Sequence, residues 1–214
     1  MQDLAQYSET KLRVHFGLVG HYSHDLGNLQ GSAQLVTVGQ EVTKSVGHAF
    51  TMPQATTDLR IVKKLLFKLS EKVAVRLRRQ NFWGSRVSCY VRYQLPPGQS
   101  RRRYTGAGQT HKIGELVNDG RLIYKHAFKI FNSFRSSLAV RMVGVTVSGL
   151  AGNVRDEPLF ARYKKLQWVL SAMDRVNAKY GDFTLRRAML ADARHLAGDT
   201  VGFGGMKEMK LESV

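Results

Sequence analysis

The chain has 214 residues, of which 43% are apolar, so it can form one large domain or two small ones with a packed core. Its net charge of +17 favours polyanionic partners, with nucleic acid as the first candidate and an anionic membrane surface as the second. The single cysteine, Cys89, excludes an intramolecular disulfide, and no apolar run reaches the ~20 residues of a membrane span. The first residues do not resemble a signal peptide, so we expect a cytoplasmic protein.

Residues 1–37 are expected to form two short helices around the tight turn Phe16-Gly-Leu-Val-Gly20, with a tether to about residue 40. A helix-hairpin-helix of this kind can present backbone N–H groups at a helix start, where a phosphate binds. Gly17 and Gly20 are therefore candidate DNA-binding residues. An ordinary helix–helix turn is the alternative interpretation.

The next region, residues 40–154, alternates between strand and helix patterns. A strand is expected from Gln40 to Met52, ending at Pro53, and a helix capped by Thr56, Thr57 or Asp58 follows it. The apolar residues of this helix recur at three- and four-residue steps: Leu59, Val62, Leu66, Leu69, Val73 and Leu77. Its basic residues occupy the opposite face, which we expect to be solvated: Arg60, Lys63, Lys64, Lys68, Lys72, Arg76 and Arg79.

A two-residue alternation marks the second strand. One face holds Val87, Cys89, Val91 and Tyr93, and the other holds Arg86, Ser88, Tyr90 and Arg92. A break at residues 96–98, a strand over 101–112, a helix over 115–134 and a strand over 140–150 complete the region. The second helix is expected to bury Leu116, Ile123, Ala127, Ile130 and Phe131. The order β-α-β-β-α-β predicts an α+β domain, in which a four-stranded sheet has two helices on one face and an open opposite face.

Residues 155–214 are expected to form a mostly helical C-terminal extension with a flexible, Gly-rich end. Its helix should run from about Pro158 to Ala178, and Tyr180-Gly-Asp182 should break it. Within this helix, Gln167-Trp168-Val169-Leu170 fits core packing.

The basic residues of the sheet point to nucleic acid. Residues 40–154 contain 20 Lys or Arg and five Asp or Glu, and a basic face gains affinity by releasing counterions, with no need for base contacts. Ser45, Gly47 and Thr51 share one face of the first strand, where short side chains let main-chain N–H groups approach phosphates. The other candidate contacts are basic: Lys44, Arg86, Arg92, Arg101, Arg102 and Arg103.

Two other function classes are weaker. An RNA-binding or ribosome-associated module would expose aromatic residues on its central strands, and Tyr90 is the one candidate; Phe50, Phe82, Trp83 and Phe131 fit core packing. An enzyme acting alone, such as a nuclease, would need clustered carboxylates, and the acidic residues of this region form no such pair. The sequence predicts no catalytic residue, metal site or small-molecule substrate in this chain.

Three segments carry a resemblance to a known family: Leu12-Arg-Val-His-Phe-Gly-Leu-Val-Gly20, Lys44-Ser-Val-Gly-His-Ala-Phe-Thr51 and Val140-Arg-Met-Val-Gly-Val-Thr-Val-Ser-Gly-Leu150. Together they resemble the C-terminal half of Y-family, translesion DNA polymerases. The resemblance covers about residues 1–152 and implies the end of the thumb, a tether and the little-finger domain.

The resemblance implies a function as well. The little finger would hold the backbones of primer–template DNA through its open sheet, with Lys44, Ser45, Gly47 and His48 in the contact segment of the first strand. Arg141 matches an arginine of the last strand, whereas Met142 and Thr146 stand where arginine can occur. The palm carboxylates that bind two Mg²⁺ ions precede this region, so Mg²⁺ is expected for the full-length polymerase and no cofactor for this chain. The resemblance also implies the replication sliding clamp as a candidate partner.

Overall fold

The computed structural model describes residues 2–31, 43–98, 103–134, 136–152, 161–193 and 196–197. The chain forms two compact units, Met1–Val42 and Thr43–Val214. Among the described helices, none is long and apolar enough to cross a membrane.

The first unit contains three short helices. They are α1 (Gln2–Gln6), α2 (Glu9–Phe16) and α3 (Leu18–Gly27). Gly17 joins α2 to α3 with a φ of +60°, a conformation that favours glycine. Gly20 lies where α3 meets α2, since a Cβ there would be 2.1 Å from the carbonyl oxygen of Leu12. The expected helix–turn–helix is confirmed, and its second glycine allows the two backbones to approach closely.

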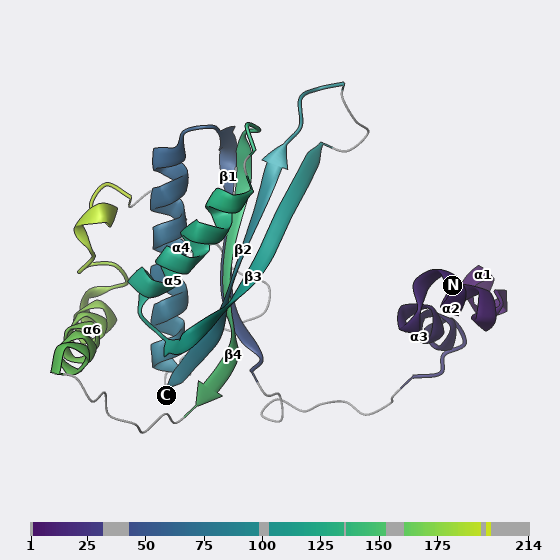
Figure 1. Ribbon diagram of the computed structural model, residues 1–214, viewed down its shortest axis with the longest axis horizontal. Coiled ribbons are helices and arrows are strands. Elements are labelled where there is room, and N and C mark those ends of the chain that lie inside the picture. Colours follow the sequence, from purple (N-terminus) through teal and green to yellow (C-terminus); the bar gives the residue numbers. More distant parts are fainter. Residues whose placement is uncertain are drawn as a thin grey trace, which may run out of the picture. The chain divides into compact units, whose positions relative to one another are not determined.

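The second unit is built on a four-stranded antiparallel sheet with the strand order β1-β4-β2-β3. Its strands are β1 (Ser45–Thr56), β2 (Phe82–Gln94), β3 (Tyr104–Val117) and β4 (Val140–Gly152). Two helices, α4 (Leu59–Arg79) and α5 (Gly120–Ser133), cover one face of this sheet (Figure 1). The predicted α+β fold, with its β-α-β-β-α-β order and one-sided helix layer, is confirmed.

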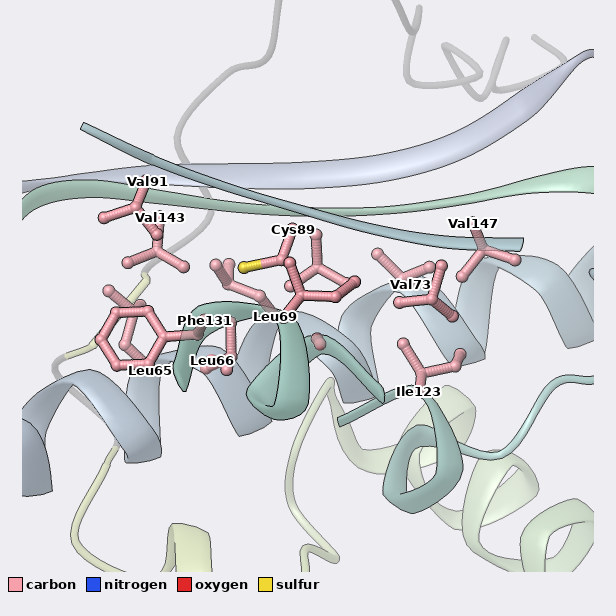
Figure 2. Packing of buried hydrophobic residues seen from close by; sticks show 14 of the residues in the cluster. Leu65, Leu66, Leu69, Val73, Cys89, Val91, Ile123, Phe131, Val143 and Val147 are labelled. Carbon is pink, nitrogen blue, oxygen red and sulfur yellow. The ribbon is translucent and has the colours of Figure 1, made fainter. Parts of the chain in front are cut away.

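The core lies between the sheet and these two helices, as Figure 2 shows. From β2, the inward side chains are the ones predicted by the alternation: Val87, Cys89, Val91 and Tyr93. The predicted stripe of α4 is also buried, apart from Leu59, which is 53% exposed because it is the first residue of the helix. Asp58 caps this helix by accepting a hydrogen bond from the amide of Arg60 at 2.8 Å.

Strand β1 runs past Pro53, so the prediction that this proline ends the strand is wrong. The strand lies at the edge of the sheet, and its register with β4 is irregular between Thr51 and Thr56. A proline lacks an N–H donor, but an edge strand with an irregular register does not need that donor in the ladder.

Helix α5 begins at Gly120, and the predicted start at Glu115 is wrong. Residues 115–117 continue β3, and Leu116 is 39% exposed instead of belonging to the helix core. The start is fixed by Asp119, whose side chain accepts a hydrogen bond from the amide of Arg121 at 3.2 Å. The other predicted core residues of this helix are buried: Ile123, Ala127, Ile130 and Phe131.

The C-terminal segment forms a third layer, on the side of α4 that faces away from the sheet (Figure 1). It consists of α6 (Ala161–Tyr180) and the 3₁₀ helix η1 (Ala188–Leu190). Helix α6 ends at Tyr180, just before Gly181 with its φ of +105°, so the predicted break is confirmed. The predicted helix start at Pro158 and the Gly-rich end lie outside the described residues.

This third layer changes the surroundings of two basic residues. Lys68 and Lys72 are only 6% and 9% exposed, so the expectation that they are solvated is wrong. Lys68 donates a hydrogen bond from Nζ to the carbonyl oxygen of Ala193 at 2.9 Å. In α6, Leu170 is buried as expected, whereas Trp168 and Val169 are 72% and 48% exposed, so the core-packing expectation is wrong for these two residues.

Candidate nucleic-acid interface

Strand pairing identifies the side chains on the helix-free face of the sheet, because directly paired residues lie on the same face. The buried alternation of β2 and β4 faces the helices, and the intervening residues face away. We call this set of paired residues the open face. It contains Ser45, Gly47, Ala49 and Thr51 of β1; Met142, Gly144, Thr146 and Ser148 of β4; Arg86, Ser88, Tyr90, Arg92 and Gln94 of β2; and Tyr104, Gly106, Gly108, Thr110 and Lys112 of β3.

The β1–β4 half of the open face is made of short, uncharged side chains and one methionine. Ser45 and Thr51 are exposed there, and Lys44 is exposed just before β1 begins. Gly47 lies against Thr146, where an added Cβ would be 2.5 Å from the Thr146 hydroxyl oxygen. Few side chains project far from this half of the sheet, so an extended ligand could approach the strand backbones.

The β2–β3 half carries the positive charge. Arg86 lies directly opposite Lys112, and both side chains are exposed. Like charges placed directly opposite each other on a sheet are destabilising. Within the described ranges, neither cation pairs with a carboxylate. An anion bound between these two side chains would remove the repulsion.

Four further arginines belong to this half or lie just before β3: Arg92, Arg101, Arg102 and Arg103. Arg92 is half-buried, with its guanidinium 6.0 Å from the centre of the Tyr104 ring. Arg103 is exposed just before β3. Arg101 and Arg102 lie outside the described residues.

Two predicted contact residues have other surroundings. His48 pairs with the buried Val145, so its side chain lies on the helix side of the sheet, and its Nε2 is buried. Arg141 donates a hydrogen bond to the carbonyl oxygen of Met52, in the irregular part of β1. Neither side chain therefore belongs to the open face.

The amides of the two hairpin glycines already donate hydrogen bonds within the first unit. The amide of Gly17 donates to the carbonyl oxygen of Arg13 at 2.8 Å, and that of Gly20 donates to Gly17 at 3.0 Å. The first amide N–H groups of an α-helix have no hydrogen-bond acceptor within the helix. The phosphate-binding groups of this hairpin would thus be the amides of Leu18 and Val19, at the start of α3.

Three basic residues of α4 are neutralised by carboxylates within the chain. Arg78 forms two hydrogen bonds to Asp174, at 2.6 and 2.7 Å. Arg79 pairs with Asp182 at 2.8 Å, and Lys64 is 2.5 Å from an oxygen of Asp192. These cations hold the third layer against α4. Their partners are 96–128 residues away along the chain, so the local sequence pattern gave no sign of them.

A further cluster joins Arg187, which precedes η1, to two buried carboxylates. Its guanidinium lies 2.7 Å from Glu71 and 2.8 Å from Asp119. Burial raises the pKa of the Glu71 carboxyl, and the nearby Arg187 charge opposes that rise. The cluster stabilises the contact of the third layer with α4 and the start of α5, and is far from the open face.

Sequence reasoning missed Lys112 and Tyr104 as members of the open face. The alternation of the strand contained this information, because both residues are an even number of positions from Gly106 and Gly108 along β3 and so share their face. What could not be read was the register with β2, which places Lys112 opposite Arg86.

The described residues contain no group of three or more His, Cys, Asp or Glu side chains able to hold a metal ion. Cys89 is buried in the core, and its burial raises the pKa of the thiol to about 12.

Known proteins are similar to this chain in sequence. The model of the impB/mucB/samB family C-terminal domain matches residues 43–159. DNA polymerase IV of Moorella thermoacetica is 28% identical over 205 residues, which cover 95% of this chain and 48% of that protein. DNA polymerase IV 2 of Bacillus subtilis is 27% identical, covering 86% of this chain and 44% of that protein. A solved chimeric Y-family DNA polymerase is 18% identical, with a TM-score of 0.49 over 71% of this chain and 41% of its own.

The family match covers more than half of the chain, and the chain spans about half the length of the curated relatives it matches. The chain thus belongs to the impB/mucB/samB family, and its residues 43–159 are the C-terminal domain of that family.

Proposed function

We propose that the open face grips primer–template DNA by its sugar-phosphate backbones, without reading base sequence. The observation that carries the proposal is the exposed Arg86–Lys112 pair, two cations placed opposite each other on a sheet face that contains no acidic residue. Curated relatives named DNA polymerase IV support DNA as the polyanion.

The distribution of charge favours this face over the outer side of α4. On the outer side of α4, Arg78 and Arg79 are held by carboxylates of the third layer, so a polyanion would have to displace those partners. On the open face, Arg86 and Lys112 could instead neutralise DNA phosphates directly and release the counterions that are condensed on the DNA. The short side chains of β1 and β4 would let the backbone lie close to the sheet.

Salt dependence of binding tests the proposal. Fluorescence anisotropy with a labelled primer–template should show log affinity falling against log salt with a slope of about −4.5, if about five phosphates are neutralised. Changing Arg86 and Lys112 to glutamine should make the slope shallower by about 1.8, which is two phosphate contacts. The matched control changes Lys165 and Arg175 of α6, which are exposed on the third layer, and should keep the slope. A slope near zero, or an equal loss in both double variants, would refute the proposal.

For the whole protein we propose nucleotide transfer by a palm with two Mg²⁺ ions, outside the chain described here. Purified alone, this chain should therefore show no Mg²⁺-dependent primer extension, while a protein that includes the preceding palm should extend the primer. The sliding clamp is a second proposed partner, which size-exclusion chromatography with purified clamp would test.

RNA is the alternative ligand, and competition separates the two. Single-stranded RNA should displace labelled primer–template less effectively than unlabelled primer–template does. RNA that competes better would favour the RNA-binding function instead.

A further inference from the structure

We infer that the β2–β3 half of the open face also binds unpaired bases of the template overhang, by stacking them on Tyr90 and Tyr104. This inference depends on the proposed DNA binding and names the part of the substrate that this half of the face holds. It adds base stacking to a surface that otherwise contacts only backbones.

The first observation is the position of the Tyr90 ring on β3. A Cβ added at Gly106 would be 2.5 Å from the Tyr90 hydroxyl oxygen and 3.0 Å from its ring, and one at Gly108 would be 3.1 Å from the ring. The ring therefore lies across two residues that have no side chain. Tyr90 is nevertheless 40% exposed. One side of the ring covers the glycines, and the rest faces solvent.

The second observation is a neighbouring tyrosine with a cation beside it. Tyr104 is 39% exposed, and the Arg92 guanidinium lies 6.0 Å from its ring centre. Tyr104 is opposite Gln94, four residues from Tyr90 along β2, which corresponds to about 13 Å at ~3.3 Å per residue. Arg92 lies between the two rings, in the place where a phosphate between two stacked bases could be neutralised.

The chemistry of this surface suits a single strand. Every base has a π face, so stacking on aromatic side chains tolerates any sequence, and nearby cations track the phosphates. Within a duplex the base faces are covered by their neighbours, so only unpaired bases can use the two rings. Arg86 and Lys112 continue the positive charge along the same two strands. Covering two glycines accounts for one side of Tyr90, but it does not account for the exposed Tyr104 beside Arg92.

Two DNA ligands with the same stem test the inference. One is a blunt hairpin, and the other carries a 5′ overhang containing 2-aminopurine. Tyr90→Leu keeps an apolar cover over the glycines but removes the ring. It should lower the affinity for the tailed hairpin about 5- to 160-fold and leave the affinity for the blunt hairpin unchanged within about twofold.

Two control variants and one fluorescence measurement show whether the effect comes from stacking on the ring. Tyr90→Phe keeps the ring and should retain the affinity for the tailed hairpin. Tyr180→Leu removes an exposed tyrosine from the end of α6 and should change neither affinity. The 2-aminopurine fluorescence should fall when the unmodified chain binds, and should fall less with Tyr90→Leu.

Each outcome separates this inference from the proposed function. Salt-dependent binding of the blunt hairpin by the unmodified chain, together with equal effects of Tyr90→Leu on both hairpins, would overturn stacking and leave the backbone grip intact. No binding of the blunt hairpin would instead overturn the proposed function. Tighter binding of a single-stranded RNA than of the DNA overhang sequence would show that the rings serve RNA, and would overturn the inference as stated.

Discussion

Replacing Arg187 by leucine should produce a large loss of stability. The guanidinium lies 2.7 Å from Glu71 and 2.8 Å from Asp119, and both carboxylate side chains are only 8% exposed. The substitution would leave two buried carboxylates without their shared cation. Breaking a buried ion pair costs about 3–5 kcal/mol, and because Arg187 itself is 20% exposed we expect the lower end of this range, about 3 kcal/mol.

The cost should depend on pH in a defined direction. Burial raises the pKa of Glu71 in the folded chain, and Arg187 opposes that rise. A carboxyl with a raised folded pKa adds stability below its unfolded pKa, and that contribution is lost as the pH rises through the folded pKa. Without Arg187 the folded pKa rises further, so the destabilisation should be greatest near neutral pH and smaller at about pH 5, where Glu71 can take up a proton.

Urea unfolding followed by circular dichroism at these two pH values measures both effects. The control is Arg60→Leu, which removes an exposed pair with Asp58 and should destabilise the chain far less than Arg187→Leu at either pH. The reasoning would be refuted if Arg187→Leu costs no more than this control, or if its cost grows on acidification.

Three smaller predictions concern local features. Gly20→Ala should loosen the packing of α2 on α3, because a Cβ would lie 2.1 Å from the Leu12 carbonyl oxygen, and amide hydrogen exchange in residues 9–27 should become faster; unchanged exchange would contradict the close approach. Asp58→Ala removes the side-chain acceptor for the Arg60 amide and should lower the free energy of unfolding measured in a urea titration, whereas an unchanged value would contradict the capping role. Cys89, whose pKa burial raises to about 12, should react with a thiol reagent at mildly alkaline pH only after denaturant is added; rapid reaction of the folded chain would show that the core is open.

The sequence predicted the structure correctly where apolar residues recur with a regular spacing, because that spacing indicates which side chains are buried. The alternation of Val87, Cys89 and Val91 identified a strand and its buried face, and the stripe of α4 identified its packing side. The prediction was wrong where the position of a residue in the folded sheet mattered. A proline normally ends a strand, but Pro53 is tolerated within β1 because β1 is an edge strand with an irregular register.

The candidate site was predicted in part for the same reason. Alternation placed Arg86 and Arg92 on the open face, but it could not supply the register that sets Lys112 beside Arg86. Nor could local pattern show that Arg78 on α4 is held by Asp174, which lies 96 residues further along the chain. Solvated and internally paired cations look alike in a sequence, and only the packing of the third layer separates them.

Lysine footprinting with and without DNA tests the central claim most directly. The chain would be labelled with an amine-reactive reagent, alone and saturated with primer–template, and each lysine quantified by mass spectrometry. DNA should protect Lys44 and Lys112, at the two sides of the open face, and leave Lys165 and Lys179 of α6 as reactive as before. Protection of the α6 lysines, with Lys112 still fully reactive in the complex, would contradict the assignment of DNA binding to the open face.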